Sequence, residues 1–258
     1  MGRSVIYVVC HDAASLAQAR ADMGQYDWAH FAVVPDDPAT SVFMESAAFL
    51  TVLPRREDEW RDADYVGILT WNAHRKIDVS RIDQCLQDGG GDIVAFVESR
   101  EAMVMQVLFP HPQFLAVWLP LTRQLGISAV DSTFWDIAPF FHNYWVCKPE
   151  WMRRYLDFFA RAVGILRTDS TIQKALWSPS LYSTHLSSER LMQIYGRTYM
   201  PYHPFVCERL PCLFFWLQGA SIRRHNLKWA SEWKAYFDMK IRTLAGYRDI
   251  MLQTAPCS

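Results

Sequence analysis

Residues 63–77 read Ala63-Asp64-Tyr65-Val66-Gly67-Ile68-Leu69-Thr70-Trp71-Asn72-Ala73-His74-Arg75-Lys76-Ile77, an apolar run that ends in a cluster of polar and cationic side chains. The apolar part, residues 65–70, is typical of a buried β-strand. In open α/β sheets, ligands bind beyond the carboxyl ends of the strands. The cluster therefore predicts a binding site, although a buried strand that runs into a solvated turn would have the same pattern.

The first half of the chain alternates between strand and helix patterns. We expect strands at residues 4–10, 29–34, 65–70 and 92–97, and helices at residues 13–23 and 43–53. Strands that alternate with helices predict an α/β fold with a parallel or mixed sheet flanked by helices.

From Phe109 onward the pattern is mainly helical. We expect helices at residues 113–125, 149–164, 187–195 and 226–252, and a short aromatic strand at residues 140–147. Pro120 is expected to kink or shorten the first of these helices. Because no repeat or linker is apparent, the sequence predicts a single domain with a helical C-terminal part.

Composition narrows the class of protein. The chain has 258 residues, 51% of them hydrophobic, with 11 Trp, 11 Tyr and 15 Phe, which favours a well-packed globule. The 26 basic and 27 acidic residues leave a net charge of −1, which argues against a nucleic-acid partner. No apolar window is long enough to span a membrane. The six cysteines are scattered without a C-x-x-C pair, so we expect buried thiols and a reducing, cytoplasmic location.

The polar cluster after residues 65–70 has the side chains that a nucleotide-linked substrate needs. An indole can stack on a base, and cationic groups can neutralise phosphates. The candidate binding residues are Thr70, Trp71, Asn72, His74, Arg75 and Lys76.

Three further groups of residues are candidates for chemistry. His142 and Asn143 interrupt an apolar run and must find partners, either substrate hydroxyls or nearby backbone groups. Glu189 and Arg190 open a predicted helix, where Glu189 either faces a pocket or only stabilises the helix start. The pair at residues 36–37 lies between prolines and is either a metal-binding pair or a solvated turn.

Four sequence blocks, in this order and spacing, resemble a GT-A-type glycosyltransferase-like family that includes sugar-transferase domains of bacteria and of large algal viruses. The resemblance covers roughly residues 40–200. The blocks are Glu45 within Phe43-Met44-Glu45-Ser46-Ala47-Ala48-Phe49, the strand Asp64-Tyr65-Val66-Gly67-Ile68-Leu69-Thr70, the segment Asn143-Tyr144-Trp145-Val146-Cys147-Lys148-Pro149-Glu150 followed by Tyr155, and the helix Glu189-Arg190-Leu191-Met192-Gln193-Ile194-Tyr195.

The resemblance implies a GT-A fold, in which a Rossmann-like mixed sheet holds a nucleotide-sugar. Residues 1–105 would then form the nucleotide-sugar-binding half, and residues 106–258 the acceptor half with the C-terminal helices. The implied activity is transfer of a sugar to a glycan or another hydroxyl acceptor. We expect Glu189 to take the acceptor proton, with His142 as the second candidate base. Glu45 and Asn143 would hold sugar or ribose hydroxyls.

The chain departs from the family at the metal site. The family strand runs into an Asp-x-Asp that binds a divalent cation, whereas Asn72-Ala73-His74 occupies that place here. His74 can still bind Mn²⁺ or Mg²⁺, but Arg75 and Lys76 can also neutralise a diphosphate directly.

Two other classes of function remain open from the sequence. One is a non-catalytic nucleotide-sugar or glycan-binding module of the same fold. The other is a different nucleotide-using enzyme, such as a methyltransferase, which the lack of a glycine-rich loop after residues 5–9 disfavours.

Overall fold

The computed structural model describes residues 2–88, 90–97, 102–108, 111–128, 132–140, 143–180, 186–229 and 231. Its described strands form one six-stranded sheet in the order β2-β1-β3-β5-β4-β6. They are β1 (Ser4–Cys10), β2 (Ala29–Val33), β3 (Tyr65–Thr70), β4 (Ile93–Ala95), β5 (Trp145–Cys147) and β6 (Ile222–Arg224). β1 pairs in parallel with β2 and β3, and β4 with β6, whereas β5 runs antiparallel between β3 and β4. The protein is therefore an α/β protein with a mixed sheet, as the sequence predicted.

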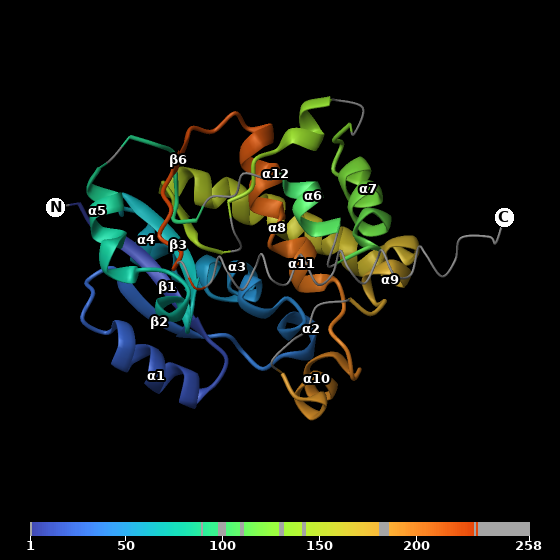
Figure 1. The fold of residues 1–258 in the computed structure, drawn as a ribbon, viewed down its shortest axis with the longest axis horizontal. Coiled ribbons are helices and arrows are strands. Elements are labelled where there is room, and N and C mark those ends of the chain that lie inside the picture. The colour runs from blue at the N-terminus through green and yellow to red at the C-terminus, as the bar shows by residue number, and fades with distance from the viewer. Residues whose placement is uncertain are drawn as a thin grey trace.

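Helices cover both faces of this sheet, and those of the second half gather beside it (Figure 1). The α-helices are α1 (Ala13–Met23), α2 (Pro38–Ser41), α3 (Ala48–Thr51), α4 (Glu57–Trp60), α5 (Ile82–Gln87), α6 (Met103–Leu108), α7 (Phe114–Gln124), α8 (Pro149–Thr168), α9 (Ser170–Leu176), α10 (Ser188–Tyr195), α11 (His203–Cys207) and α12 (Leu210–Leu217). Short 3₁₀ helices are η1 (Met44–Ala47), η2 (Leu53–Arg56), η3 (Ala73–Arg75), η4 (Val79–Arg81) and η5 (Ser132–Asp136).

Alternate residues of the strands point into two separate hydrophobic cores. Ile6 and Val8 of β1 pack on the side of α1 and α5, whereas Val5 and Tyr7 pack on the side of α3 and α8. Successive side chains of a strand point to opposite faces, so a continuously apolar strand needs cover on both. This explains why β1 and β3 consist almost entirely of apolar residues.

The order of connections places a crevice at the carboxyl ends of β1 and β3. From β1 the chain passes through α1, on one face, to β2 at the edge of the sheet. From β2 it crosses through α2, α3 and α4, on the other face, to β3 on the far side of β1. The connections therefore diverge between β1 and β3, which is where open α/β sheets bind their ligands.

The antiparallel β5 brings a third segment to this edge of the sheet. Its register pairs Ile68 of β3 with Trp145, so Asn143, two residues earlier, lies beside the end of β3. Gly67 makes this close pairing possible, because a Cβ atom there would lie 2.4 Å from the carbonyl oxygen of Trp145.

Most of the predicted elements are confirmed. The strands at 4–10 and 65–70 and the helix at 13–23 have the predicted bounds. The strand at 29–34 and the helix at 187–195 differ by one residue at one end, and the strand predicted at 92–97 is shorter. The helix predicted at 149–164 continues to Thr168, and α7 runs through Pro120 without ending there. Packing of α7 against α8 and α9 compensates for the hydrogen bond that a proline cannot donate.

The helix predicted at residues 43–53 is wrong. The segment forms η1, α3 and the start of η2 in place of one helix. Met44 has a φ of 53°, a left-handed conformation that no α-helix contains. Pro54 then sits in the first turn of η2, where its lack of an N–H costs nothing.

Two other boundaries are also corrected. The aromatic strand predicted at 140–147 is a strand only at Trp145–Cys147, and residues 141–142 lie outside the described part. The helix predicted from Asn226 does not begin there, because Lys228 forms a β-bridge with Ile77 and Leu227 is buried against the sheet. Its remaining residues, apart from Ser231, lie outside the described part.

No helix among the described residues is long and apolar enough to cross a membrane. Cys10, Cys85, Cys147, Cys207 and Cys212 are buried and free, as expected of structural thiols.

Candidate functional site

A pocket of about 180 Å³ opens at the crevice between the ends of β1 and β3. Its walls come from the segments after β1, β2 and β3, from η1, and from α10. The polar and charged residues that line it are His11, Asp12, Ser15, Asp36, Ser41 and Arg190, and the larger apolar ones are Met44, Trp71, Leu186 and Ile194. We call it the carboxyl-edge pocket.

Glu45, in η1, does not line this pocket but contacts His11, which does. The residue before Glu45, Met44, lines the pocket and has the one left-handed backbone conformation among the described residues other than glycine. Such a conformation costs roughly 1–3 kcal/mol and is typical of sites where a side chain must be aimed. This turn directs the side chain of Glu45 toward His11 and Thr70, at the ends of β1 and β3. A regular α-helix at residues 43–53 would not contain the left-handed Met44.

Glu45 and His11 form an ion pair beneath the carboxyl-edge pocket. Nε2 of His11 lies 3.6 Å from Oε1 of Glu45, and the two side chains are only 25% and 22% exposed. Burial alone would lower the pKa of His11, but the hydrogen bond and the negative charge of Glu45 raise that pKa above its ordinary value. Burial alone would raise the pKa of Glu45, but His11 lowers it to about 2. The contact with Glu45 thus favours protonation of His11 more than in an ordinary histidine.

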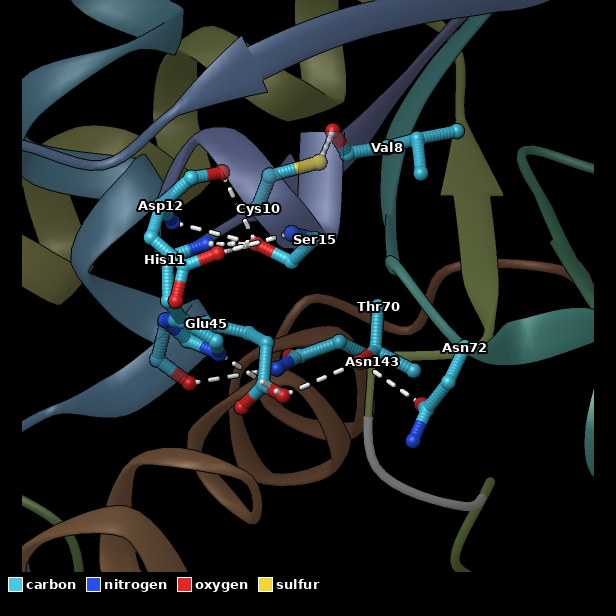
Figure 2. Close-up of polar contacts among 10 residues, drawn as sticks. Val8, Cys10, His11, Asp12, Ser15, Glu45, Thr70, Asn72 and Asn143 are labelled. Carbon is cyan, nitrogen blue, oxygen red and sulfur yellow. Dashed lines mark hydrogen bonds and ion pairs between the residues drawn. The ribbon is translucent and has the colours of Figure 1, made fainter. Parts of the chain in front are cut away.

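A hydrogen-bonded network continues from Glu45 to the end of β3 (Figure 2). The hydroxyl of Thr70 lies 3.0 Å from Oε1 of Glu45 and 3.1 Å from Oδ1 of Asn72. Asn143, buried beside them, donates from Nδ2 to Oγ of Ser46 at 3.3 Å. Its Oδ1 atom is buried and has no hydrogen-bond partner among the described residues. The predicted residues Glu45, Thr70, Asn72 and Asn143 are thus brought together.

Asp12 lines the pocket and is also the N-cap of α1. Its carboxylate accepts from the backbone N–H of Ser15 at 2.7 Å, and the Ser15 hydroxyl accepts from the Asp12 backbone N–H at 3.0 Å. These bonds form a capping box. The backbone hydrogen bond from Ser15 lowers the pKa of Asp12, so the carboxylate stays charged.

The cationic residues of the predicted cluster separate in the structure. Arg75 is exposed and lies over the ring of Trp71, 5.7 Å from its centroid, and Trp71 itself lines the pocket. The positive charge of Lys76 helps to lower the pKa of Glu45, after the larger effect of His11. His74 is turned toward α1, with Nε2 at 3.3 Å from Oδ2 of Asp22, and does not line the pocket.

At the start of α10, the structure separates Glu189 from Arg190. Arg190 lines the carboxyl-edge pocket, and its charge acts on His11 and Asp12. Glu189 is exposed and does not line this pocket. Its pKa is lowered by its own backbone N–H and by the hydroxyl of Ser187, the N-cap of the helix. His142, the second predicted base, lies outside the described residues.

A larger cavity, about 900 Å³, lies at the opposite edge of the sheet. It is lined by residues at the starts of β1 and β3, including Ser4 and Tyr65, and by Lys148 after β5. The amino ends of parallel strands are not where α/β sheets bind their ligands. Size alone therefore does not make it the functional site.

No group of three or more His, Cys, Asp or Glu side chains able to hold a metal ion occurs in the described parts of the chain. The two aspartates of the Pro-rich turn have different positions. Asp36 lines the carboxyl-edge pocket, whereas Asp37 is the N-cap of α2. Asp12 and Asp36 are thus the carboxylates that line this pocket.

The class that fold and site define is an α/β protein with a polar pocket at the carboxyl edge of a mixed sheet. Comparison with known proteins adds no family, since no family model, curated protein or solved structure matches the sequence.

His11, Asp12, Ser15, Ser41 and Met44 line the pocket but were not predicted from the sequence, and His11 and Asp12 are the charged or ionisable ones. His11 and Asp12 follow directly after β1, an almost entirely apolar strand, as the predicted cluster follows β3. An apolar run followed at once by polar side chains is the pattern that residues 65–77 also have, so residues 4–12 carry a signal for both.

Proposed function

We propose that this protein is a glycosyltransferase of the GT-A type, which moves a sugar from a nucleotide-sugar donor to a glycan or another hydroxyl acceptor. The observation that carries the proposal is the position of the carboxyl-edge pocket, at the divergence of connections between β1 and β3. Nucleotides bind in this crevice in doubly wound α/β sheets. The mixed sheet is compatible with a Rossmann-like core of this type.

The side chains at the pocket suit a diphosphate. Arg190 supplies a guanidinium, and His11 supplies an imidazolium that Glu45 stabilises. Trp71 offers an aromatic surface at the same wall. When the bond between the sugar and the diphosphate breaks, negative charge grows on the leaving phosphate oxygens. Cations already fixed in place stabilise that charge without further reorganisation.

Glu45 has a supporting role in this mechanism. Its carboxylate accepts a hydrogen bond from the Thr70 hydroxyl and faces His11. It therefore holds the imidazole in place and favours the charged form of His11. The buried Oδ1 of Asn143 has no hydrogen-bond partner among the described residues, and that Asn143 holds a sugar or ribose hydroxyl stays a prediction. Glu189 and His142 were the predicted bases for the acceptor proton. Because Glu189 is exposed and does not line the carboxyl-edge pocket, we propose His142 as the base to test first.

A divalent cation has at most a modest role in this proposal. Asn72-Ala73-His74 stands where the resembling family has Asp-x-Asp, and the cations at the pocket can stabilise the leaving group directly. If chelation abolished turnover and Mn²⁺ restored it, Asp12 and Asp36 would be the ligands to test, before His74. The buried free thiols support a reducing, cytoplasmic location.

The proposal is tested by thermal-shift measurements with UDP-, GDP- and dTDP-sugars. A ligand that binds only the folded state raises the melting temperature. We expect one donor to do so for the wild type and for Arg123→Ala, an exposed arginine on α7, and expect Arg190→Ala to reduce the shift strongly. Absence of a shift with every donor would contradict the proposal. Binding without turnover would support the non-catalytic module.

A further inference from the structure

The strand β2 forms one edge of the sheet, because the strand order begins with it. It pairs with β1 and packs on α1, and no other described helix or strand packs closely against it. Figure 1 shows β2 and α1 at the outer side of the molecule, away from α7 and α9. We call the side of β2 that faces away from β1 the β2 edge.

The pairing with β1 decides which backbone groups of β2 point outward. The N–H of Val34 donates to the carbonyl of Cys10 at 2.9 Å, so even-numbered residues of this segment turn their backbone groups toward β1. Backbone groups of successive strand residues point to alternate sides. The N–H and carbonyl groups of Phe31 and Val33 therefore point away from β1. No residue in the described parts of the chain forms a backbone hydrogen bond with them.

These outward groups match those of a second copy of the same strand. In an antiparallel pair, residues that turn both backbone groups toward each other exchange two hydrogen bonds. With Ala32 opposite Ala32 of the second copy, Phe31 lies opposite Val33 of that copy, and every outward group of both residues has a partner. A register centred on Phe31 fits less well. It places Val33 opposite Ala29, whose N–H already donates to the carbonyl of Tyr26 at 3.0 Å.

The side chains of the β2 edge are also complementary in this register. Val33 is 43% exposed, and Phe31 is partly buried on the face that α1 covers. Each Phe31 then packs on Val33 of the other copy, and such aromatic and β-branched pairs stabilise sheets. Edge strands that stay unpaired are usually protected by lysine, proline or a bulge. β2 contains neither lysine nor proline.

The charges beside the β2 edge favour the same arrangement. Arg20, in the last turn of α1, is exposed and lies 5.9 Å from the ring centroid of Phe31. Because residues 24–28 join α1 to β2, Arg20 lies toward the amino end of β2. The carboxyl end of β2 leads to exposed Asp36 and Asp37. Antiparallel pairing brings this acidic end of one copy toward Arg20 of the other, so opposite charges approach.

The outer face of α1 can extend the contact beyond the strands. Ala13 and Ala17 are exposed and lie at helical spacing on the same face as Arg20. Such small side chains let the α1 helices of two copies approach each other. This contact adds buried area to the strand pairing, as a stable dimer requires.

We propose that the protein forms a two-fold symmetric dimer, in which the β2 edges of two copies pair antiparallel with Ala32 at the centre. The two sheets then join into one continuous sheet. This inference goes beyond the proposed function and needs no nucleotide-sugar.

Analytical ultracentrifugation of the full chain tests the inference. We expect wild type to sediment as a dimer at micromolar concentrations, and Val33→Lys to weaken the dimer at least tenfold. Val33 is exposed, so the lysine removes no core side chain and adds like charges across the two-fold axis. The matched control is Leu217→Lys on α12, where the leucine is 38% exposed; its dimer should dissociate within about twofold of wild type. Circular dichroism confirms that both variants are folded.

A cross-linking experiment tests the register. In the proposed pairing the two Val33 residues are diagonal neighbours, about 7–8 Å apart. A bismaleimide of that length should therefore link Val33→Cys to itself and should not link Leu217→Cys. Both variants are made in a Cys257→Ser background, since the five other cysteines are buried.

Three results overturn the inference. A monomeric wild type shows that the β2 edge stays unpaired. An unchanged dimer in Val33→Lys places the contact on another face of the protein. A dimer in which Val33→Cys does not cross-link rejects antiparallel pairing centred on Ala32.

Discussion

The contact between His11 and Glu45 makes stability depend on pH. The pKa of His11 is raised in the folded state, so its stabilisation is complete below the ordinary value of 6.5 and is lost as pH rises through the raised pKa. The pKa of Glu45 is lowered from 4.5 to about 2, so its stabilisation is present above 4.5 and is lost as pH falls toward 2. The pair therefore stabilises the fold most between these two ordinary values.

We expect His11→Gln to lower stability by on the order of 1 kcal/mol near pH 6, because the pair is partly exposed. The difference from wild type should shrink as pH rises to 9. Urea unfolding of both proteins from pH 5 to 9 measures it. A difference that stayed constant over this range would show that the pair has no electrostatic role.

Glu189 gives a second prediction for a single residue. The carboxylate is exposed and bonded at the start of α10, so Glu189→Gln should cost at most about 1 kcal/mol and leave kcat near that of wild type. Steady-state kinetics and melting temperature of this variant decide the matter. A fall in kcat of roughly 10²-fold with unchanged donor affinity would instead identify Glu189 as the base.

Part of the site was predictable from the sequence. The contacts that were not predictable join residues that lie far apart in the sequence. Thr70 and Asn72 follow an obvious strand, and Glu45 and Asn143 came from short matching blocks. Nothing local shows that Glu45 faces His11, because a left-handed Met44 and two chain reversals produce that contact. Lys76 acts on Glu45, whereas His74 faces Asp22. These different directions also depend on the tertiary structure and not on the local sequence.

At the scale of elements, the pairing of β3 with β5 depends on a residue without a side chain. Gly67→Ala would bring a Cβ atom to 2.4 Å from the backbone of Trp145, so we expect a loss of about 1–3 kcal/mol. Gly164→Ala, inside α8 with no atom within 4 Å of its Cβ, should stabilise by about 0.5–1 kcal/mol. Urea denaturation of both variants checks the opposite signs. Equal effects would contradict the described strand pairing.

The turn after β3 carries a prediction about binding. Arg75 covers Trp71, and the charge of Lys76 reaches Glu45, so both contribute positive potential beside the pocket. Replacing both by Ala should weaken nucleotide-sugar binding at least tenfold and change the melting temperature of the free protein little, because surface cations add little stability. Calorimetry and thermal unfolding compare the two effects. Unchanged affinity would show that Arg75 and Lys76 do not act on the bound diphosphate.

Elements with a strong local pattern were predictable, and those decided by packing were not. β1 and β3 are almost continuous apolar runs, and α1 is rich in residues that favour a helix, such as Ala, Leu, Gln and Arg. The strand β6 has only three residues, two of them arginines, and exists because it pairs with β4. The segment from Asn226 to Trp229 has helix-forming neighbours but is held extended by its bridge to Ile77.

For the whole molecule, the two halves of the chain meet at the carboxyl edge of the sheet. Segments that follow β1, β2 and β3 line the carboxyl-edge pocket, and α10 adds Arg190 and Ile194 from the second half of the chain. In our proposal the sheet half holds the nucleotide-sugar, and Arg190 of α10 faces its diphosphate.

Release of nucleoside diphosphate from nucleotide-sugars, followed by chromatography, tests the central claim most directly. Many transferases slowly pass their sugar to water, so the acceptor need not be known. We expect release from one donor by wild type and by Arg123→Ala, and at least a tenfold slower release by His11→Gln and Arg190→Ala. A donor that binds to the wild type but yields no nucleoside diphosphate would contradict the proposed sugar transfer.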